Sequence, residues 1–168
     1  NTTSMNGSIK VMKFGGTSVG KPHRMHEVAN LITKDKERKI VVLSAVSGTT
    51  NSLVEIGNFL SAGNKGAAKE KIDALEAQYQ SFIKELVTTP EALQKAGDVL
   101  REHFEFLTII LRISYNEALN KDILAQGELL STKLFSIYLS EKGIDHALLP
   151  ALDFMSIDAN DEPQVETI

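Results

Sequence analysis

The hydrophobic positions of the chain fall into short continuous runs and longer helical stripes. Three short runs, residues 9–14 (IKVMKF), 39–46 (KIVVLSAV) and 143–150 (GIDHALLP), predict strands. The second run has four apolar residues in succession, which is typical of a strand that is covered on both faces in a parallel sheet. A helix predicted over residues 22–36 joins the first two runs, with Pro22 at a position where its missing N–H costs nothing. The order strand, helix, strand predicts a right-handed crossover in an α/β fold.

Two long amphipathic stripes follow the second run. Apolar residues recur at every third or fourth position over residues 66–87 and again over residues 89–111, with a short TTP turn between them. This pattern predicts a helical hairpin, an insert over residues 65–114 that packs on itself and on the sheet. Two more helices are predicted over residues 50–62 and 128–142, the second ending at the glycine that follows it.

Composition restricts the class of protein. The chain has 168 residues, 42% of them hydrophobic and 24% charged, as expected for one globular domain of ordinary size. A net charge of -4 without a cluster of basic residues weighs against nucleic acid as a partner. The absence of cysteine excludes disulfides and cysteine-based zinc sites. No apolar run approaches the roughly 20 residues of a membrane-spanning helix. The polar N-terminus also lacks the apolar segment of a signal peptide, so we expect a cytoplasmic protein with no membrane partner.

The two ends of the chain differ from its middle. Residues 1–8 are polar, and we expect them to be disordered or left over from an expression vector. The segment after residue 150 is polar and loop-like, while the predicted parallel strands would leave open edges that proteins normally cover or extend. Residues 9–168 are therefore interpreted as the front part of a larger α/β domain.

A glycine turn after the first predicted strand is the first candidate for chemistry. Residues 13–20 read KFGGTSVG, so that Lys13 comes before a turn of Gly15, Gly16, Thr17 and Ser18, and a helix starts soon after. A strand that ends in bare backbone amides beside a helix N-terminus is suited to binding an anion. The turn is not a Walker A loop, in which the lysine follows the glycines. A glycine pair can also serve only as a connector.

Two further segments carry small polar or charged residues. Residues 43–51 (LSAVSGTTN) follow the second strand, at the end of a parallel sheet where ligands bind. One of the two threonines there is expected to cap the next helix, and five small polar side chains are more than a cap requires: Ser44, Ser47, Thr49, Thr50 and Asn51. In residues 126–132 (QGELLST), Glu128 is expected at a helix start, as a partner of the helix dipole or as a receptor for a ligand amine.

Together, the motifs KFGGTSVG, LSAVSGTTN and GELLST resemble the N-terminal lobe of aspartate kinases, which belong to the amino acid kinase superfamily. The resemblance spans roughly residues 9–150. It implies a three-layer α/β/α sandwich around a mainly parallel sheet. It also implies the transfer of the γ-phosphoryl group of ATP, with Mg²⁺, to the side-chain carboxylate of L-aspartate. The product, 4-phospho-L-aspartate, leads to lysine, threonine and methionine, and we expect the intact protein to be a homo-oligomer.

The resemblance also implies roles for the residues of the glycine turn. Lys13 would hold the transferring phosphoryl group and would be the catalytic residue. Gly15 and Gly16 would form the turn beneath the phosphates of ATP, with Thr17 and Ser18 beside them. Phosphoryl transfer requires alignment and the neutralisation of charge, and these groups can contribute to both.

The same resemblance implies three aspartate-binding residues. Ser44 and Thr50 would contact aspartate, and Glu128 would meet its amino group. The nucleophile is a carboxylate with a pKa near 4, which is ionised at neutral pH, so that no general base is needed. The sequence accordingly shows no Ser-His or His-Asp arrangement.

The sequence departs from the family pattern in what it lacks. The family continues into a second lobe, which supplies most of the nucleotide pocket and an arginine, and regulatory ACT domains usually follow. Leu149-Pro150 stands where many relatives carry an aromatic or apolar residue followed by aspartate. We therefore expect half a site and no measurable kinase activity from this chain alone. The long helical insert looks more like the forms fused to homoserine dehydrogenase.

Two alternatives and a few residues remain. The chain could come from another kinase of the superfamily, with glutamate or N-acetylglutamate as substrate, or it could be a non-catalytic module that dimerises through residues 65–114. The histidines are expected to be non-catalytic, with His23 and His26 on a solvated helix face and His103 and His146 structural. Three phenylalanines are expected in the core or in a subunit interface: Phe82, Phe104 and Phe106.

Overall fold

The computed structural model describes residues 9–149, in which one short sheet packs against five helices. The predictions for residues 1–8 and for the chain from residue 150 onward lie outside the described residues. Of the helices in the described part, none combines the length and the apolar character needed to cross a membrane.

The predicted strand–helix–strand unit is present. Strands β1 (Lys10–Phe14) and β2 (Lys39–Leu43) pair in parallel, with Lys13 opposite Val42, and helix α2 (Pro22–Ile32) connects them. The backbone N–H of Ser44 donates to the carbonyl of Phe14 at 2.9 Å, which carries the pairing one residue past the end of β2. The prediction of an α/β fold with a parallel sheet is confirmed, although α2 is four residues shorter than predicted.

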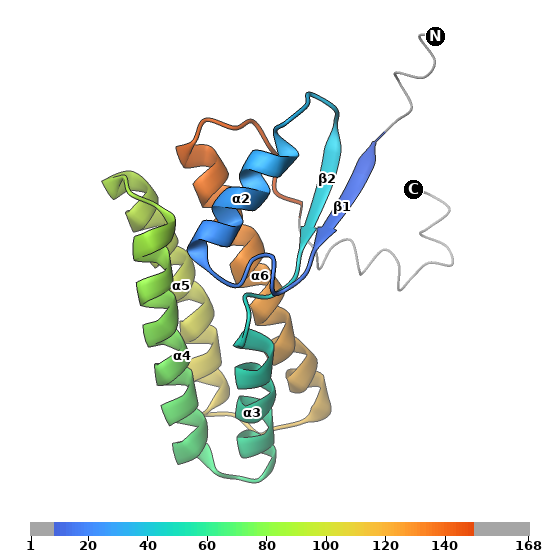
Figure 1. Ribbon diagram of the computed structural model, residues 1–168. Helices are drawn as coiled ribbons and strands as arrows, with labels where there is room; N and C mark the ends of the chain where they lie inside the picture. Colours follow the sequence, from blue (N-terminus) through green and yellow to red (C-terminus); the bar gives the residue numbers. More distant parts are fainter. Residues whose placement is uncertain (1–8, 150–168) are drawn as a thin grey trace.

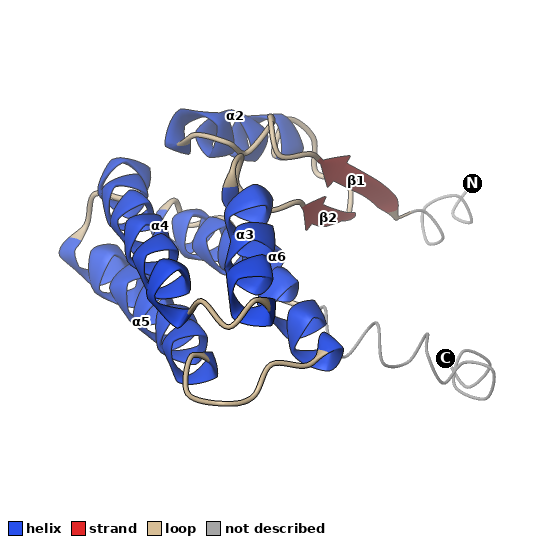
Figure 2. Cartoon of the chain, turned by 90° about the horizontal axis from the view of Figure 1, so that it is seen from below, coloured by secondary structure: helices blue, strands red, loops and turns tan. Residues whose placement is uncertain are grey.

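The two faces of this sheet differ in their surroundings. Met12, Phe14 and Val41 point toward the helices and pack on the core, as alternation along a strand requires. On the opposite face Val11 and Val42 are 58% and 43% exposed. Figure 2 shows the described helices on one side of the sheet. The described residues therefore contain the sheet and one of the two helical layers of the expected sandwich.

The remaining four helices form a bundle beside the sheet (Figure 1). They are α3 (Thr49–Ser61), α4 (Lys65–Leu86), α5 (Pro90–Ile110) and α6 (Glu117–Glu141). Each packs on the next along the chain, and α6 returns to pack on α3, so the four surround a common core. The predicted hairpin of α4 and α5 exists, but it packs on helices α2, α3 and α6, and α6 in turn contacts β2.

The core of the bundle holds the predicted aromatic residues. The ring of Tyr79 lies 6.0 Å from the rings of both Phe82 and Phe104, and all three side chains are buried. Phe106 is partly buried and packs on the same core. The bundle is held mainly by this apolar burial, the dominant favourable term in folding.

The third predicted strand is wrong in its described part. Helix α6 ends before Gly143, whose φ of 73° turns the chain, and residues 144–149 form no strand. The ring of His146 bonds back to the carbonyl of Ile144 at 2.8 Å and to the hydroxyl of Ser136 at 2.7 Å. One carbonyl that a sheet ladder would use is thus occupied by a local contact.

The start of α6 also differs from the prediction. The helix begins at Glu117, eleven positions before Glu128, because the side chain of Asn116 accepts a hydrogen bond from the N–H of Leu119 at 3.0 Å and caps it. Glu128 therefore lies in the interior of a 25-residue helix.

One histidine prediction needs correction. His26 does not lie on a solvated face: its Nε2 is 2.9 Å from the carbonyl of Leu86, and its ring stacks on Tyr138 at 4.5 Å. It joins α2 to the end of α4 and to α6. His23 is exposed, as predicted.

Candidate functional site

Three segments that are far apart in the sequence meet at the carboxyl end of the sheet. The loop after β2 lies between the glycine turn and α6, and glycines allow both approaches. A β-carbon added at Gly20 would lie 2.7 Å from the Cβ of Ser47, and one added at Gly127 would lie 2.8 Å from the Cβ of Ala45. Neither position has room for a side chain, so these contacts depend on glycine.

A hydroxyl group connects α6 to the end of β2. Ser131, which is fully buried, donates to the carbonyl of Ser44 at 2.7 Å and lies 3.2 Å from the carbonyl of Glu128. The carbonyls of Ser44 and Glu128 thus both lie within hydrogen-bonding distance of one side-chain oxygen. The structure brings these two predicted aspartate-binding residues together.

Lys13 and Ser44 share one face of the sheet. Lys13 is opposite Val42 in the parallel register, and Val42 and Ser44 are two residues apart, so their side chains point to the same side. Lys13 and Ser44 are therefore diagonal neighbours on adjacent strands. The side chain of Lys13 is exposed, and within residues 9–149 it has no ion-pair partner.

The glycine turn is only partly available to an anion. The N–H groups of Ser18 and Val19 donate to the carbonyls of Gly15 and Gly16, at 3.0 Å and 3.3 Å, and close the turn. The prediction that the turn leaves its amides free is therefore wrong for Ser18. Gly15 is exposed, and a β-carbon there would meet no atom within 4 Å, so a ligand can approach it from solvent.

The two threonines after β2 have different surroundings. Neither caps α3 with its side chain, because the N-cap is Gly48, whose φ of 86° suits glycine. Thr49 is buried, and its hydroxyl is 2.7 Å from that of Tyr79. Burial raises the pKa of Tyr79 to about 12, against the opposite effect of this hydrogen bond, so the pair stays neutral. Thr50 is exposed in the first turn of α3 and free to meet a ligand.

Glu128 is exposed on α6, one helical turn before Ser131 and hence on the same side of the helix. The expectation that it partners a helix dipole is wrong, because the dipole acts within the first and last turns. The other interpretation, in which the carboxylate receives a cationic group of a ligand, stays a prediction.

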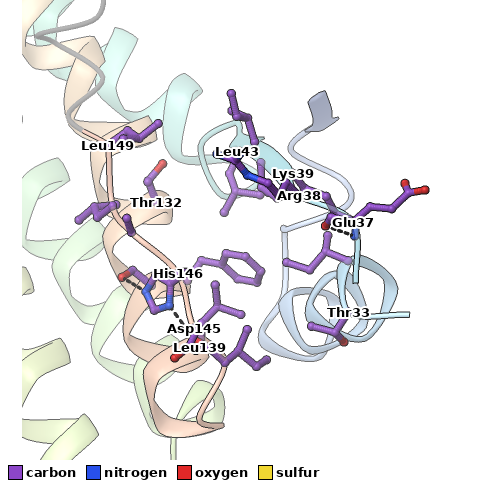
Figure 3. Close-up of a pocket in the computed structure, with 18 of the residues that line it drawn as sticks. Thr33, Glu37, Arg38, Lys39, Leu43, Thr132, Leu139, Asp145, His146 and Leu149 are labelled. Carbon is purple, nitrogen blue, oxygen red and sulfur yellow. Dashed lines mark hydrogen bonds between the residues drawn. The ribbon is translucent and has the colours of Figure 1, made fainter. Parts of the chain in front are cut away.

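A groove between β2 and the end of α6 contains none of the predicted site residues, although Leu43 and Thr132 of the second and third motifs line it. It has a volume of about 510 Å³ and runs between β2, the end of α6 and residues 144–149. Figure 3 shows Leu43, Thr132 and His146 around it. We place the candidate site at the carboxyl end of the sheet instead, because the three motifs converge there.

The sequence of this chain matches the Amino acid kinase family over residues 8–168, almost its whole length. The chain belongs to the amino acid kinase family. This family member is similar in structure to aspartokinase III from E. coli in complex with lysine and aspartate, with a TM-score of 0.65 and 30% identity. The match covers 82% of this chain and 30% of that one. The same enzyme in complex with aspartate and ADP gives a TM-score of 0.64 and 32% identity over 81% and 30% of the two chains.

Curated relatives agree with the predicted resemblance. Chloroplastic aspartokinase 2 from Arabidopsis thaliana is 41% identical over 140 residues, which covers 79% of this chain and 25% of the relative. Lysine-sensitive aspartokinase 3 from Escherichia coli (strain K12) is 34% identical over 136 residues, which covers 81% of this chain and 29% of the relative. The match to this amino acid kinase chain thus covers between a quarter and three tenths of the length of these relatives. The predicted resemblance to the N-terminal lobe of aspartate kinases is confirmed.

Proposed function

We propose that the chain is part of an aspartate kinase and forms the side of its active site that binds aspartate and the terminal phosphates of ATP. The observation that carries the proposal is the place of Ser44 at the carboxyl end of the parallel sheet: it is the diagonal neighbour of Lys13 on the next strand, and its carbonyl shares the Ser131 hydroxyl with the carbonyl of Glu128, so that residues of three separate motifs meet around it. The relatives named aspartokinase support it.

The residues fit a phosphoryl transfer that needs no general base. The side-chain carboxylate of aspartate is ionised at neutral pH and can attack phosphorus directly. ATP would supply the phosphoryl group, and Mg²⁺ would neutralise charge on its phosphates. The exposed ammonium of Lys13 and the open backbone at Gly15 suit contact with phosphate oxygens, with Gly16, Thr17 and Ser18 beside them.

A metal bound through the phosphates of the nucleotide fits the donor set better than a metal held in a protein cage. Within residues 9–149, no group of three or more histidine, aspartate or glutamate side chains is placed to hold a metal ion. Mg²⁺ is often bound by one or two carboxylates together with substrate phosphates.

Aspartate would lie between the end of β2 and α6. Thr50 and Ser44 offer small polar groups there, and the exposed Glu128 carboxylate offers a partner for the α-ammonium group. A charge-assisted hydrogen bond of this kind gives both affinity and orientation. This arrangement favours a substrate with a free amino group over one whose amino group is acylated.

The test is ATP-dependent formation of an acyl phosphate by the full-length protein, trapped with hydroxylamine. We expect the hydroxamate of aspartate, with glutamate and N-acetylglutamate as much poorer acceptors. A clear preference for glutamate or N-acetylglutamate would assign the protein to another branch of the family. No hydroxamate with any of the three acids would contradict the proposal.

We also propose that the intact protein is a homo-oligomer and that it works in the cytoplasm. The relatives from Arabidopsis thaliana are chloroplastic. Localisation of a tagged full-length protein distinguishes the two compartments. Light scattering of the purified protein gives its mass, and a monomer across the working concentration range would contradict the proposed homo-oligomer.

A further inference from the structure

A chain of three hydrogen bonds links α5 to both ends of the GELLST segment on α6. The Nδ1 of His103 lies 2.6 Å from the Oε1 of Gln126, and its Nε2 lies 3.0 Å from the Nζ of Lys133. Gln126 in turn donates from Nε2 to the carbonyl of Asp122 at 3.0 Å. His103 and Gln126 are both buried, at 5% and 8% exposure, so water does not readily replace these partners.

The direction of every bond in this chain is fixed by chemistry. The carbonyl of Asp122 can only accept, so the amide nitrogen of Gln126 must face it and the amide oxygen must face His103. That oxygen can only accept, so the proton of the imidazole is on Nδ1. The ammonium of Lys133 can only donate, so it requires an unprotonated Nε2. The neutral imidazole with its proton on Nδ1 satisfies all three bonds.

The positions of the two partners give the chain of bonds its significance. Gln126 directly precedes the segment 127–132, and Lys133 directly follows it, seven residues later on the same side of the helix. The other side of the segment carries Gly127 and Ser131, which contact the loop after β2. His103 therefore bonds to α6 on the side away from the loop after β2, at both ends of the 127–132 segment that contains Glu128.

We propose that His103 is a positioning residue: in its neutral form it holds both ends of the 127–132 segment and so sets the placement of Glu128 for aspartate. This role rests on the proposed function. Protonation of His103 places an N–H group against the Lys133 ammonium, which breaks that bond and adds repulsion. The expected result is a looser segment and weaker aspartate binding at low pH.

The surroundings of His103 determine the pH at which aspartate binding weakens. Burial lowers the pKa of His103 below its usual 6.5, and the Lys133 ammonium on α6 lowers it further. The hydrogen bond with Gln126 and the carboxylate of Glu102, its neighbour on α5, act in the opposite direction. Since the folded pKa is depressed, the contribution of the neutral histidine is complete above pH 6.5 and is lost as the pH falls through the folded pKa.

The first part of the test measures the imidazole itself, in full-length protein labelled with ¹⁵N-histidine. We expect the NMR spectrum of His103 at about pH 8 to report the proton on Nδ1. Lys133→Met should raise the pH midpoint of His103, since it removes a cation, and Lys121→Met, on the exposed start of α6, should leave the midpoint unchanged. A proton on Nε2, or a midpoint that Lys133→Met does not move, would overturn the proposal whatever reaction the protein catalyses.

The second part measures the KM for aspartate from about pH 8 to about pH 5, a range in which aspartate itself does not titrate. We expect the KM to rise by about tenfold as His103 protonates, with a smaller change in kcat. His103→Leu should show the raised KM at every pH. A wild-type KM that stays constant through the midpoint of His103 would overturn the positioning role. If the imidazole behaves as expected but aspartate is not phosphorylated, the proposed function fails and the positioning role fails with it.

Discussion

At Gly127 the interior of a long helix touches the loop that follows β2, and no side chain fits between them. A β-carbon there would lie 2.8 Å from the Cβ of Ala45 and 3.4 Å from the Cδ1 of Leu53. The sequence shows that this glycine belongs to a motif, but it does not show why a glycine is needed there. The need comes from contact with a segment some eighty residues away. Ser131, in the same motif, is similar: its bond to Ser44 is visible only in the fold.

Substitution of Gly127 tests this close approach. Gly127→Ala should lower the free energy of unfolding by about 1–3 kcal/mol, because the added methyl overpacks a buried contact. Gly97→Ala is the matched control in the interior of α5, where a β-carbon meets no atom within 4 Å. It should raise stability by about 1 kcal/mol through helix propensity. Urea unfolding of both variants measures the difference, and equal effects of the two substitutions would contradict the packing described.

Substitution of Glu128 tests the proposed amine contact. Glu128→Gln keeps the size of the side chain and removes its charge, so the KM for aspartate should rise by about tenfold or more. Glu117→Gln, in the exposed first turn of the same helix, should change the KM by less than about twofold. Steady-state kinetics of the full-length protein give both values. An unchanged KM in the Glu128 variant would remove the residue from the aspartate site.

At the scale of elements, local signals predicted most of the structure and failed where a long-range contact decides. The first two strands and the helical hairpin follow from hydrophobic period and from a proline and a threonine at the hairpin turn. The predicted start of α6 at residue 128 is wrong, because Asn116 caps a helix that begins at Glu117, eleven residues before Glu128. The third strand was wrong because an apolar run alone does not provide a pairing partner.

The start of α5 depends on a carboxylate from another helix. The Oε2 of Glu141 accepts hydrogen bonds from the backbone N–H groups of Thr88 and Thr89, at 2.8 Å and 2.7 Å. Burial alone would raise the pKa of Glu141, but these bonds outweigh it and hold the pKa below its usual 4.5. Because the folded pKa is depressed, this stabilisation is present above pH 4.5 and is lost as the pH falls through the folded pKa.

Glu141→Ala should therefore lower the free energy of unfolding by about 1 kcal/mol near neutral pH, a value that allows for its partial exposure. The difference between variant and wild type should shrink as the pH falls below 4.5. Glu141→Gln retains an acceptor oxygen, so its free energy of unfolding should lie between those of the wild type and Glu141→Ala. Denaturant unfolding over this pH range is the measurement, and a difference that does not change with pH would contradict the role of the carboxylate.

At the scale of the whole molecule, the arrangement weakens the alternative of a non-catalytic dimerisation module. The apolar stripes of α4 and α5 are used within the chain, where they pack on one another and on α3 and α6. They form the core of the bundle rather than an exposed apolar face. The bundle instead acts as the support that sets α6 against the carboxyl end of the sheet, where the candidate site lies.

The central claim is that Lys13 acts on the transferring phosphoryl group. The most direct measurement is aspartate phosphorylation by the full-length Lys13→Ala variant, compared with Lys10→Ala on the same strand. Lys10 is exposed and pairs with Glu37 only at 3.7 Å on the surface, so its loss should change kcat by less than about twofold. Lys13→Ala should lower kcat by about a hundredfold or more, with an unchanged unfolding midpoint. Turnover close to wild type in the Lys13 variant, or an equal loss in both variants, would contradict the account.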